Sequence, residues 1–206
     1  MLGPMPLAGA EFEVVLERLD AASEELRTLE ACLSPAEVKR ADRFFFQRHR
    51  RRYVVARARL RQLLGQRLGV APQDIALVYG ANGKPRLADE AMRFSVSHSG
   101  EIALFAFSEA REVGVDIEAV RPIDSADTIA AHILSRRELR AYAAARDKVA
   151  AFLRFWTRKE ALAKALGDGL SIPVEKLEPS RAPGWRVHSF CPLSGFIAAV
   201  ACHTGP

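Results

Sequence analysis

Two stretches of this 206-residue chain resemble each other at a nearly constant offset of about 101 residues. Each starts with the form of a capping box, in which a Ser and a Glu three positions later close the N-terminus of a helix: Ser34-Pro35-Ala36-Glu37 and Ser135-Arg136-Arg137-Glu138. Further along, Leu68, Pro72 and Ile75 have counterparts in Leu170, Pro173 and Leu177. A repeat of this length predicts a pseudo-dimer of two similar halves, with a ligand cleft between them. Chance similarity between two amphipathic helices is the alternative.

The rest of the chain mixes helical and strand patterns without regular alternation. Apolar spacing predicts a helix from about His49 to Leu68, which can stop near Gly65 or Gly69, and a helical stretch that begins at Ser135 and ends at Leu166. The predicted strands are Ile75–Tyr79, Arg93–Val96, Ile102–Ser108, Val113–Glu118, Trp185–Phe190 and Phe196–Cys202. This order favours an α+β fold, with an N-terminal half at 1–108 and a C-terminal half at 109–206.

The whole chain has a formal net charge of +5, and its basic residues are concentrated in one segment. The segment from 39 to 67 contains eleven of them, and only Asp42 opposes them: Lys39, Arg40, Arg43, Arg48, Arg50, Arg51, Arg52, Arg57, Arg59, Arg61 and Arg67. Such a field attracts a polyanion, which can be a nucleic acid, a nucleotide cofactor or an acidic protein. No nucleic-acid-binding motif accompanies it, so nucleic acid is not the expected partner. A solvated, arginine-rich helix is the alternative.

The N-terminus and the cysteines indicate a cytoplasmic protein. The first residues lack a basic segment, and Glu11 and Glu13 interrupt the apolar stretch, so we expect no signal peptide. No apolar run approaches the roughly 20 residues that span a bilayer. The three cysteines have no metal-ligand spacing and are expected to be reduced.

The segment Val113-Gly114-Val115-Asp116-Ile117-Glu118 alternates apolar residues with acidic ones. On a strand, alternate side chains share a face, so Asp116 and Glu118 are predicted to point the same way while the aliphatic side chains enter a core. Two neighbouring carboxylates repel each other unless a cation lies between them, and Mg²⁺ prefers oxygen ligands. A half-exposed strand with its acids in water is the alternative.

A second candidate is the helix from Phe152 to Gly167. Residues three and four apart on a helix are neighbours, so Glu160 and Lys164 share a face. Glu160 could complete a metal site or accept a proton, and Lys164 could hold a phosphate. Their alternative role is a surface salt bridge worth about 0.3–0.5 kcal/mol. The nearby aromatic residues are predicted to be core.

Two short loops are weaker candidates. Ser97-His98-Ser99 places hydroxyls and an imidazole at the end of a strand, next to Gly100, where they suit an anionic oxygen. Gly83-Lys84-Pro85 predicts a tight turn with a lysine at its tip, but it is not a P-loop. Read singly, each is most simply an ordinary turn.

Together, these motifs occur in the order and spacing of a known family. Gly83-Lys84-Pro85, Ser97-His98-Ser99, Gly114 through Glu118, and the segment containing Trp156, Lys159, Glu160 and Lys164 resemble the motifs of the Sfp-like 4′-phosphopantetheinyl transferases. The resemblance covers roughly residues 34–175 and includes Arg43-Phe44 and Gly167-Asp168-Gly169-Leu170-Ser171. Ser95 departs from it, because the family often has Asn there.

The resemblance implies residue roles around coenzyme A, which the family binds in a cleft between two similar halves. Asp116, Glu118 and Glu160 are expected to bind Mg²⁺, with Mn²⁺ as a second option. Lys164 is expected to touch the transferred phosphate. The residues expected near the 3′-phosphate and the diphosphate are Arg48, Arg52, Lys84, Pro85, Ser97 and His98.

The implied reaction is attack of a serine hydroxyl of an apo acyl or peptidyl carrier protein on the β-phosphate of coenzyme A, with 3′,5′-ADP as the leaving group. Glu160 is expected to take the serine proton, directly or through a water. A pseudo-dimer of this kind is expected to act as a monomer. Three alternatives remain: a nucleic-acid-binding protein, a different magnesium-dependent nucleotide enzyme, and an inactive scaffold of the same fold. The particular carrier and pathway are not predicted.

Overall fold

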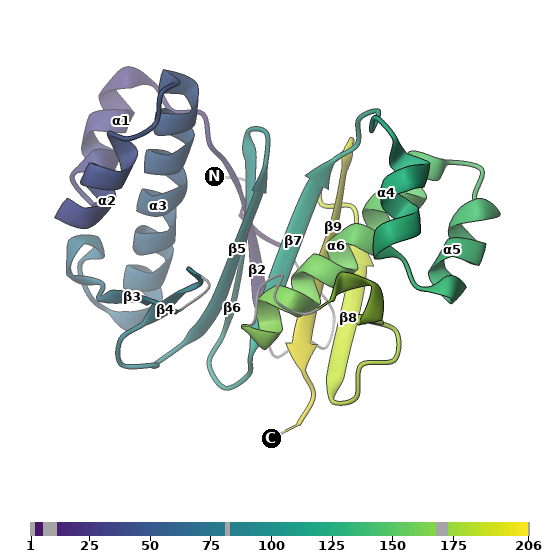
Figure 1. Cartoon of the computed structure of the whole chain (residues 1–206). Coiled ribbons are helices and arrows are strands. Elements are labelled where there is room, and N and C mark those ends of the chain that lie inside the picture. The colour runs from purple at the N-terminus through teal and green to yellow at the C-terminus, as the bar shows by residue number, and fades with distance from the viewer. Residues whose placement is uncertain (1–2, 6–11, 81–82, 168–172, 206) are drawn as a thin grey trace.

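The computed structural model describes residues 3–5, 12–80, 83–167 and 173–205. They form a mixed α/β fold of helices and three small sheets (Figure 1). The helices are α1 (Ser23–Glu30), α2 (Pro35–Ala41), α3 (Gln47–Leu68), α4 (Ala126–Ile133), α5 (Arg136–Ala143) and α6 (Lys148–Leu166), with 3₁₀ turns η1 (Pro72–Asp74) and η3 (Val174–Lys176). The strands are β1 (Gly3–Met5), β2 (Glu13–Arg18), β3 (Leu77–Tyr79), β4 (Pro85–Leu87), β5 (Arg93–Ser99), β6 (Ile102–Ser108), β7 (Val113–Ala119), β8 (Trp185–Phe190) and β9 (Phe196–His203).

The repeat in the sequence is accompanied by a repeat in the order of elements. β2 is followed by three helices, a 3₁₀ turn and the strands β5 and β6, and β7 is followed by three helices, a 3₁₀ turn and the strands β8 and β9. The strand order is β1-β2-β6-β5 in one sheet and β7-β9-β8 in the other, all antiparallel. The first sheet therefore contains the same three-strand arrangement as the second, plus β1 at its edge. The hairpin of β3 and β4 is an addition between η1 and β5.

The two larger sheets pack against each other, and helices cover their outer faces (Figure 1). Alternate residues of β6 divide between these layers. Phe105 and Phe107 pack in the cluster that includes α3, whereas Leu104 packs between the sheets with Val115 of β7 and Val200 of β9. All seven residues of β6 are buried, because the strand has a packed layer on each side. On the other side, α6 packs on β9.

Both predicted capping boxes are confirmed. The Ser34 hydroxyl accepts a hydrogen bond from the Glu37 backbone at 3.3 Å, and the Glu37 carboxylate accepts one from the Ser34 backbone at 2.9 Å. Ser135 and Glu138 make the same two bonds at 3.3 and 2.9 Å. These bonds satisfy N–H groups at the starts of α2 and α5 that the helices themselves leave without partners.

The structure corrects several expected boundaries. The helix expected from about His49 starts at Gln47, and it continues through Gly65 to end at Gly69, where φ is 70°. Gly65 is instead a point of close approach, since a Cβ there would lie 2.6 Å from the Val70 carbonyl oxygen. The stretch from Ser135 to Leu166 is two helices, α5 and α6. Leu170, one member of the sequence repeat, lies outside the described residues.

The predicted strands are present, and those at Ile102–Ser108 and Trp185–Phe190 have the predicted bounds. β1, β2, β4, α1 and α4 were not predicted. None of the helices in the described ranges is long and apolar enough to cross a membrane.

Candidate active site

Strand β5 presents two different chemical surfaces because its side chains alternate. Phe94 and Val96 belong to the side that packs toward α3, and His98 lines a cavity on that same side. Ser95, Ser97 and Ser99 point the other way and are hydrogen-bonded to β7. The Ser97-His98-Ser99 motif is therefore divided between two environments, as expected of alternate residues on a strand. It lies at the predicted strand end, followed by Gly100 with φ of 60°.

Strand β7 carries the paired carboxylates as predicted. Val113, Val115 and Ile117 are buried in the apolar layer between the sheets, while Asp116 and Glu118 share the opposite face. Gly114 lies on that face too, directly beneath α6. A Cβ at Gly114 would lie 2.0 Å from the Ala161 carbonyl oxygen and 2.5 Å from the Ala165 nitrogen. Only glycine permits this approach, which brings the acidic face of β7 against α6.

A compact polar network joins β5, β7 and α6. The Ser97 hydroxyl donates to Asp116 Oδ1 at 2.7 Å, and the Lys164 ammonium of α6 donates to Asp116 Oδ1 at 2.7 Å and to Ser97 Oγ at 2.9 Å. Asp116 is only 4% exposed, so its charge is stabilised chiefly by these contacts. Asp116 and Lys164 are thus in direct contact, and Ser97 lies with them rather than in the basic cavity.

Glu160 lies near the same network, on the helix face of Lys164. Burial raises the pKa of its carboxyl; Lys164 opposes that shift, and Asp116 and Glu118 add to it. Burial also raises the pKa of Glu118, although its hydrogen bond from Ser99 acts in the other direction. Asp116 acts on the pKa of both Glu160 and Glu118, and Glu118 acts on that of Glu160, so the three predicted carboxylates lie within electrostatic reach of one another.

The donor chemistry of these carboxylates fits a hard divalent cation. Asp116 Oδ2 and Glu160 Oε1 are buried and have no hydrogen-bond partner among the residues that the structure describes. Buried carboxylate oxygens that lack a donor, beside further negative charge, are stabilised by a cation with oxygen ligands. In the arrangement that the described residues adopt, however, no three His, Cys, Asp or Glu side chains are grouped so that they could hold a metal ion.

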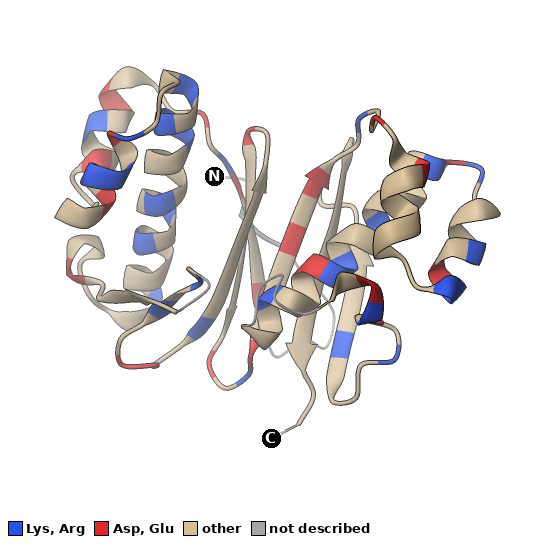
Figure 2. Cartoon of the chain, in the orientation of Figure 1, with Lys and Arg blue, Asp and Glu red and all other residues tan. Residues whose placement is uncertain are grey.

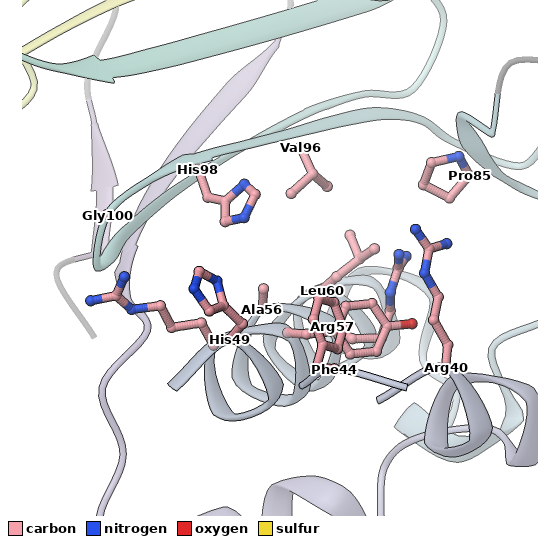
Figure 3. Close-up of a pocket in the computed structure, with 12 residues that line it drawn as sticks. Arg40, Phe44, His49, Ala56, Arg57, Leu60, Pro85, Val96, His98 and Gly100 are labelled. Atoms are coloured by element: carbon pink, nitrogen blue, oxygen red, sulfur yellow. The ribbon is translucent and has the colours of Figure 1, made fainter. Parts of the chain in front are cut away.

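A basic cavity of about 490 Å³ lies on the other side of β5, between that strand and α3 (Figure 3). His98 and His49 project toward each other from opposite walls. The lining also includes cationic and aromatic side chains of α2, α3 and the loop that joins them: Arg40, Phe44, Arg52, Tyr53 and Arg57. The guanidinium groups of Arg40 and Arg57 lie 5.6 and 5.7 Å from the centre of the Tyr53 ring. Such a cavity suits a flat ring that carries negative charge.

Burial and positive neighbours keep the His98 imidazole neutral near pH 7. Burial lowers its pKa, and Lys164 and Arg52 lower it further. His98 is therefore influenced from both sides of the strand: by Lys164 of the acidic network and by Arg52 of the basic cavity. In that state the ring has one hydrogen-bond donor and one acceptor.

A second cavity, of about 290 Å³, adjoins the first, because Pro85 and Val96 line both. Its walls include Lys84, Glu160 and Lys164. Burial lowers the pKa of Lys84, and Glu112, whose carboxylate lies 3.6 Å from the Lys84 ammonium, acts against that shift. The cavity lined by arginines of α3 thus adjoins the cavity lined by Glu160 and Lys164 of α6. Figure 2 shows basic residues along α3 and acidic ones on β7 and α6.

Comparison with known proteins covers both parts of the molecule. Residues 112–200 match the model of the 4′-phosphopantetheinyl transferase superfamily, and residues 18–110 match the model of a 4′-phosphopantetheinyl transferase N-terminal region. The 4′-phosphopantetheinyl transferase HetI of Nostoc is 36% identical over 198 residues, which cover 89% of this chain and 84% of that protein. This chain belongs to the 4′-phosphopantetheinyl transferase superfamily.

More distant members of the superfamily match over shorter regions. The 4′-phosphopantetheinyl transferase AcpT of Salmonella typhimurium is 40% identical over 125 residues, 58% of this chain and 64% of that protein. The human L-aminoadipate-semialdehyde dehydrogenase-phosphopantetheinyl transferase is 28% identical over 165 residues, 73% of this chain and 53% of that protein. The aligned part of the chain thus spans less than two thirds of the length of each of these two relatives.

Most, but not all, of the residues expected to contact the nucleotide line one of the two cavities. Arg52, His98 and Pro85 line the basic cavity, and Lys84 and Pro85 line the second one. Arg48 does not line either cavity. Its guanidinium lies 5.2 Å from the centre of the exposed Phe46 ring.

Sequence reasoning missed part of the lining of the basic cavity. Arg40 and Arg57 were noted only as members of the basic stretch, and Tyr53 and His49 were not singled out. Tyr53 and Arg57 are four residues apart, so their helical spacing could have indicated that they share a face.

Lys159, which belongs to the same helix motif, has a structural position. It is fully buried, 2.9 Å from a Glu138 carboxylate oxygen, and its ammonium donates to the Val174 carbonyl at 2.9 Å and to the Leu177 carbonyl. Lys159 therefore links α6 to the capping box of α5 and to η3. The aromatic residues of the motif, Phe152, Phe155 and Trp156, pack in an apolar cluster with α4 and α5, as predicted.

Proposed function

We propose that this chain transfers the 4′-phosphopantetheine group of coenzyme A to a serine hydroxyl of an apo carrier protein and releases 3′,5′-ADP. The proposal depends chiefly on one observation: a cavity lined by arginines and histidines adjoins a second cavity lined by Glu160, Lys164 and Lys84. That arrangement suits a substrate with a charged nucleotide at one end and a reacting diphosphate at the other. Membership of the superfamily and the names of its relatives support the same reaction.

The basic cavity is the proposed site of the 3′-phosphoadenosine end. Arg52, Arg40 and Arg57 would supply charge-assisted hydrogen bonds to phosphate oxygens, and Tyr53 offers a ring for contact with the base. The neutral His98 has an N–H group to donate to a phosphate oxygen. We keep Arg48 as a weaker candidate, because its path to the cavity would require it to leave Phe46.

The diphosphate is proposed to lie in the second cavity. Lys84 and Lys164 would contact its oxygens, with Lys164 at the phosphate that is transferred. Asp116, Glu118 and Glu160 would hold Mg²⁺ or Mn²⁺, whose charge, when the ion is bound, would offset that of the diphosphate and of the leaving group. Support for this ligand set comes from the buried oxygens of Asp116 and Glu160 that lack a hydrogen-bond partner among the described residues, and from the effect of Asp116 and Glu118 on the pKa of Glu160.

Glu160 is the proposed base for the attacking serine. A serine hydroxyl is a weak nucleophile at neutral pH and needs a group that takes its proton. The raised pKa of Glu160 brings the carboxylate closer to the range in which a general base is efficient. Its position in the lining of the second cavity gives a carrier serine a direct approach.

The overall arrangement is proposed to be a pseudo-dimer of the halves 1–108 and 109–206, with coenzyme A in the cleft between them. The matching strand order of the two sheets supports the division, and the two regions that match family models meet between residues 110 and 112. A monomer with an acidic carrier protein as partner, acting in the cytoplasm, completes the proposal. The basic face of α3 would favour the encounter with such a partner.

Intact mass spectrometry of an apo carrier protein tests the reaction. The carrier is incubated with this chain, coenzyme A and MgCl₂, with EDTA in a parallel sample. The expected result is a phosphopantetheine mass gain on the carrier that requires the metal, together with 3′,5′-ADP in the supernatant. No gain on fatty-acid, polyketide or peptide carriers would contradict the proposed reaction, and a gain unaffected by EDTA would contradict the metal alone.

A further inference from the structure

The contact between β5 and β7 is made by serine side chains. The two strands lie in different sheets, so they do not pair through a backbone ladder. Three serines in alternate positions on β5 bridge them. Ser95 Oγ accepts from the Val115 backbone at 3.1 Å, and Ser99 Oγ accepts from the Ala119 backbone at 3.1 Å.

Two of these serines also bind the acidic side chains of β7. Ser97 donates to Asp116 Oδ1 at 2.7 Å, and Ser99 donates to Glu118 Oε2 at 2.8 Å. All three serines are buried, so water does not compete for the hydrogen bonds of their hydroxyl groups. Each carboxylate therefore has one oxygen fixed by a serine of β5, and Asp116 Oδ2 is left buried without a partner.

We propose that Ser97 and Ser99 are positioning residues that orient the carboxylates of Asp116 and Glu118 for the divalent cation. This inference rests on the proposed metal ligands. Because a hydroxyl hydrogen bond occupies one oxygen of each carboxylate, the other oxygen is the one that turns toward the cation. Partners of this kind fix the orientation of metal ligands, and their loss commonly weakens metal binding about 10- to 100-fold.

Both hydroxyls join two groups, since Ser97 accepts from the Lys164 side chain and donates to Asp116, but Ser99 is anchored to a backbone N–H and so has the clearer positioning role. It accepts from the Ala119 N–H and donates to Glu118, so the backbone of β7 fixes the direction in which the hydroxyl proton points. Ser97 shares Asp116 with Lys164, whose ammonium would still hold Asp116 if the hydroxyl were removed. The effect of removing Ser99 is therefore expected to be the larger of the two.

Mn²⁺ titration followed by electron paramagnetic resonance tests this inference without any turnover. Free Mn²⁺ is measured with the complete chain, with and without saturating coenzyme A. Ser99→Ala is expected to raise the Mn²⁺ dissociation constant at least about 10-fold and Ser97→Ala by less. Ser99→Thr, which keeps the hydroxyl on a strand, is expected to restore most of the affinity.

Ser95→Ala is the matched control, because Ser95 bridges the same two strands but binds a backbone N–H and no carboxylate. It is expected to lower thermal stability as Ser99→Ala does and to leave the Mn²⁺ dissociation constant unchanged. Equal Mn²⁺ affinity in the wild type and Ser99→Ala would overturn the inference. So would an equal loss in Ser95→Ala and Ser99→Ala, since strand docking would then explain the effect.

The outcomes also separate this inference from the proposed function. A wild-type chain that binds no Mn²⁺ in either condition would overturn the metal ligands and the inference together. A chain that binds Mn²⁺ normally after Ser97→Ala and Ser99→Ala, yet transfers phosphopantetheine in the mass-spectrometric assay, would overturn the inference alone.

Discussion

The N-terminal and C-terminal parts of the molecule have the same strand order, but the side chains that their long helices present differ in charge. In the first part, α3 presents arginines and a tyrosine toward β5 and forms a basic cavity. In the second, α6 presents Glu160 and Lys164 toward the carboxylates of β7. A shared scaffold thus supports an anion-binding surface in one part and an acidic cluster in the other. Function here depends on a few side chains, and the topology alone does not define it.

A buried ion pair is common to both parts, although its residues differ. In the first, Arg61 of α3 donates to the Glu37 carboxylate at 2.7 Å and to the Pro72 and Ile75 carbonyls at 3.0 Å. In the second, Lys159 of α6 is 2.9 Å from Glu138 and donates to the carbonyls of Val174 and Leu177.

Each pair connects a capping box, a long helix and the following 3₁₀ turn. The conserved element is therefore the geometry, in which a buried cation satisfies a carboxylate and the carbonyls of the turn. The identity of the cation varies between the parts, but its place in the helix does not, since Arg61 and Lys159 each lie eight residues before the glycine that ends the helix.

The largest expected effect comes from Glu160→Gln, which removes the proposed base from the second part only. We expect single-turnover transfer to fall about 10²- to 10⁴-fold, the usual contribution of a general base. Coenzyme A affinity, measured by calorimetry, should change far less, because the basic cavity is intact. Glu175→Gln, an exposed carboxylate on η3, is the control. Undiminished transfer by Glu160→Gln would contradict the assignment of the general base to the second part.

Breaking either buried ion pair tests whether the two are equivalent. Lys159→Met should lower the free energy of unfolding by about 3–5 kcal/mol, because it leaves the Glu138 carboxylate buried without its cation. Arg61→Met should lower it by less, because Arg57 Nε still lies 3.4 Å from the Glu37 carboxylate. Urea denaturation measures this difference.

The matching double variants, Lys159→Met with Glu138→Gln and Arg61→Met with Glu37→Gln, should recover part of the loss, since glutamine can still close a capping box. If one single variant were neutral while the other unfolded, the two pairs would not be equivalent.

Gly114→Ala tests the packing that is specific to the second part. The added methyl would overlap the backbone of α6 at 2.0 Å, which backbone atoms cannot relieve by a rotamer change. We expect a loss of about 1–3 kcal/mol in thermal denaturation, together with weaker Mn²⁺ binding as α6 moves from β7. Gly80→Ala, whose Cβ would meet its nearest neighbour at 3.6 Å, should be tolerated. Equal stability of both variants would contradict this account of Gly114.

The smallest effect is expected from the arginines of the first part. Arg52→Ala should raise the KM for coenzyme A about tenfold, because it removes one charge-assisted hydrogen bond from the basic cavity. Arg48→Ala should raise it much less, since Arg48 contacts Phe46 and does not line the cavity. Steady-state kinetics at saturating carrier protein distinguish them. A larger effect for Arg48 would restore the role that the family resemblance implied for it.

The sequence by itself determined the local features and the chemical inventory. Capping boxes and alternation depend on residues a few positions apart, so both capping boxes, the acidic face of β7 and the sharing of a helix face by Glu160 and Lys164 could be predicted. The edge strands β1 and β4 were missed because three-residue strands carry too little pattern for periodicity to detect.

Only the tertiary structure decided how those features meet. Arg48 and Arg52 are four residues apart on one helix, yet Arg52 lines the cavity, whereas the Arg48 side chain lies over the Phe46 ring and donates to His49. The sequence shows Gly114 only as part of a strand motif. The reason that a glycine is required there is the close approach of α6, which lies more than forty positions further along the chain. Likewise, Ser97 and Ser99 gained carboxylate partners only when β5 and β7, strands of different sheets, packed against each other. Such contacts depend on the rotation and approach of whole elements, and no local pattern specifies these.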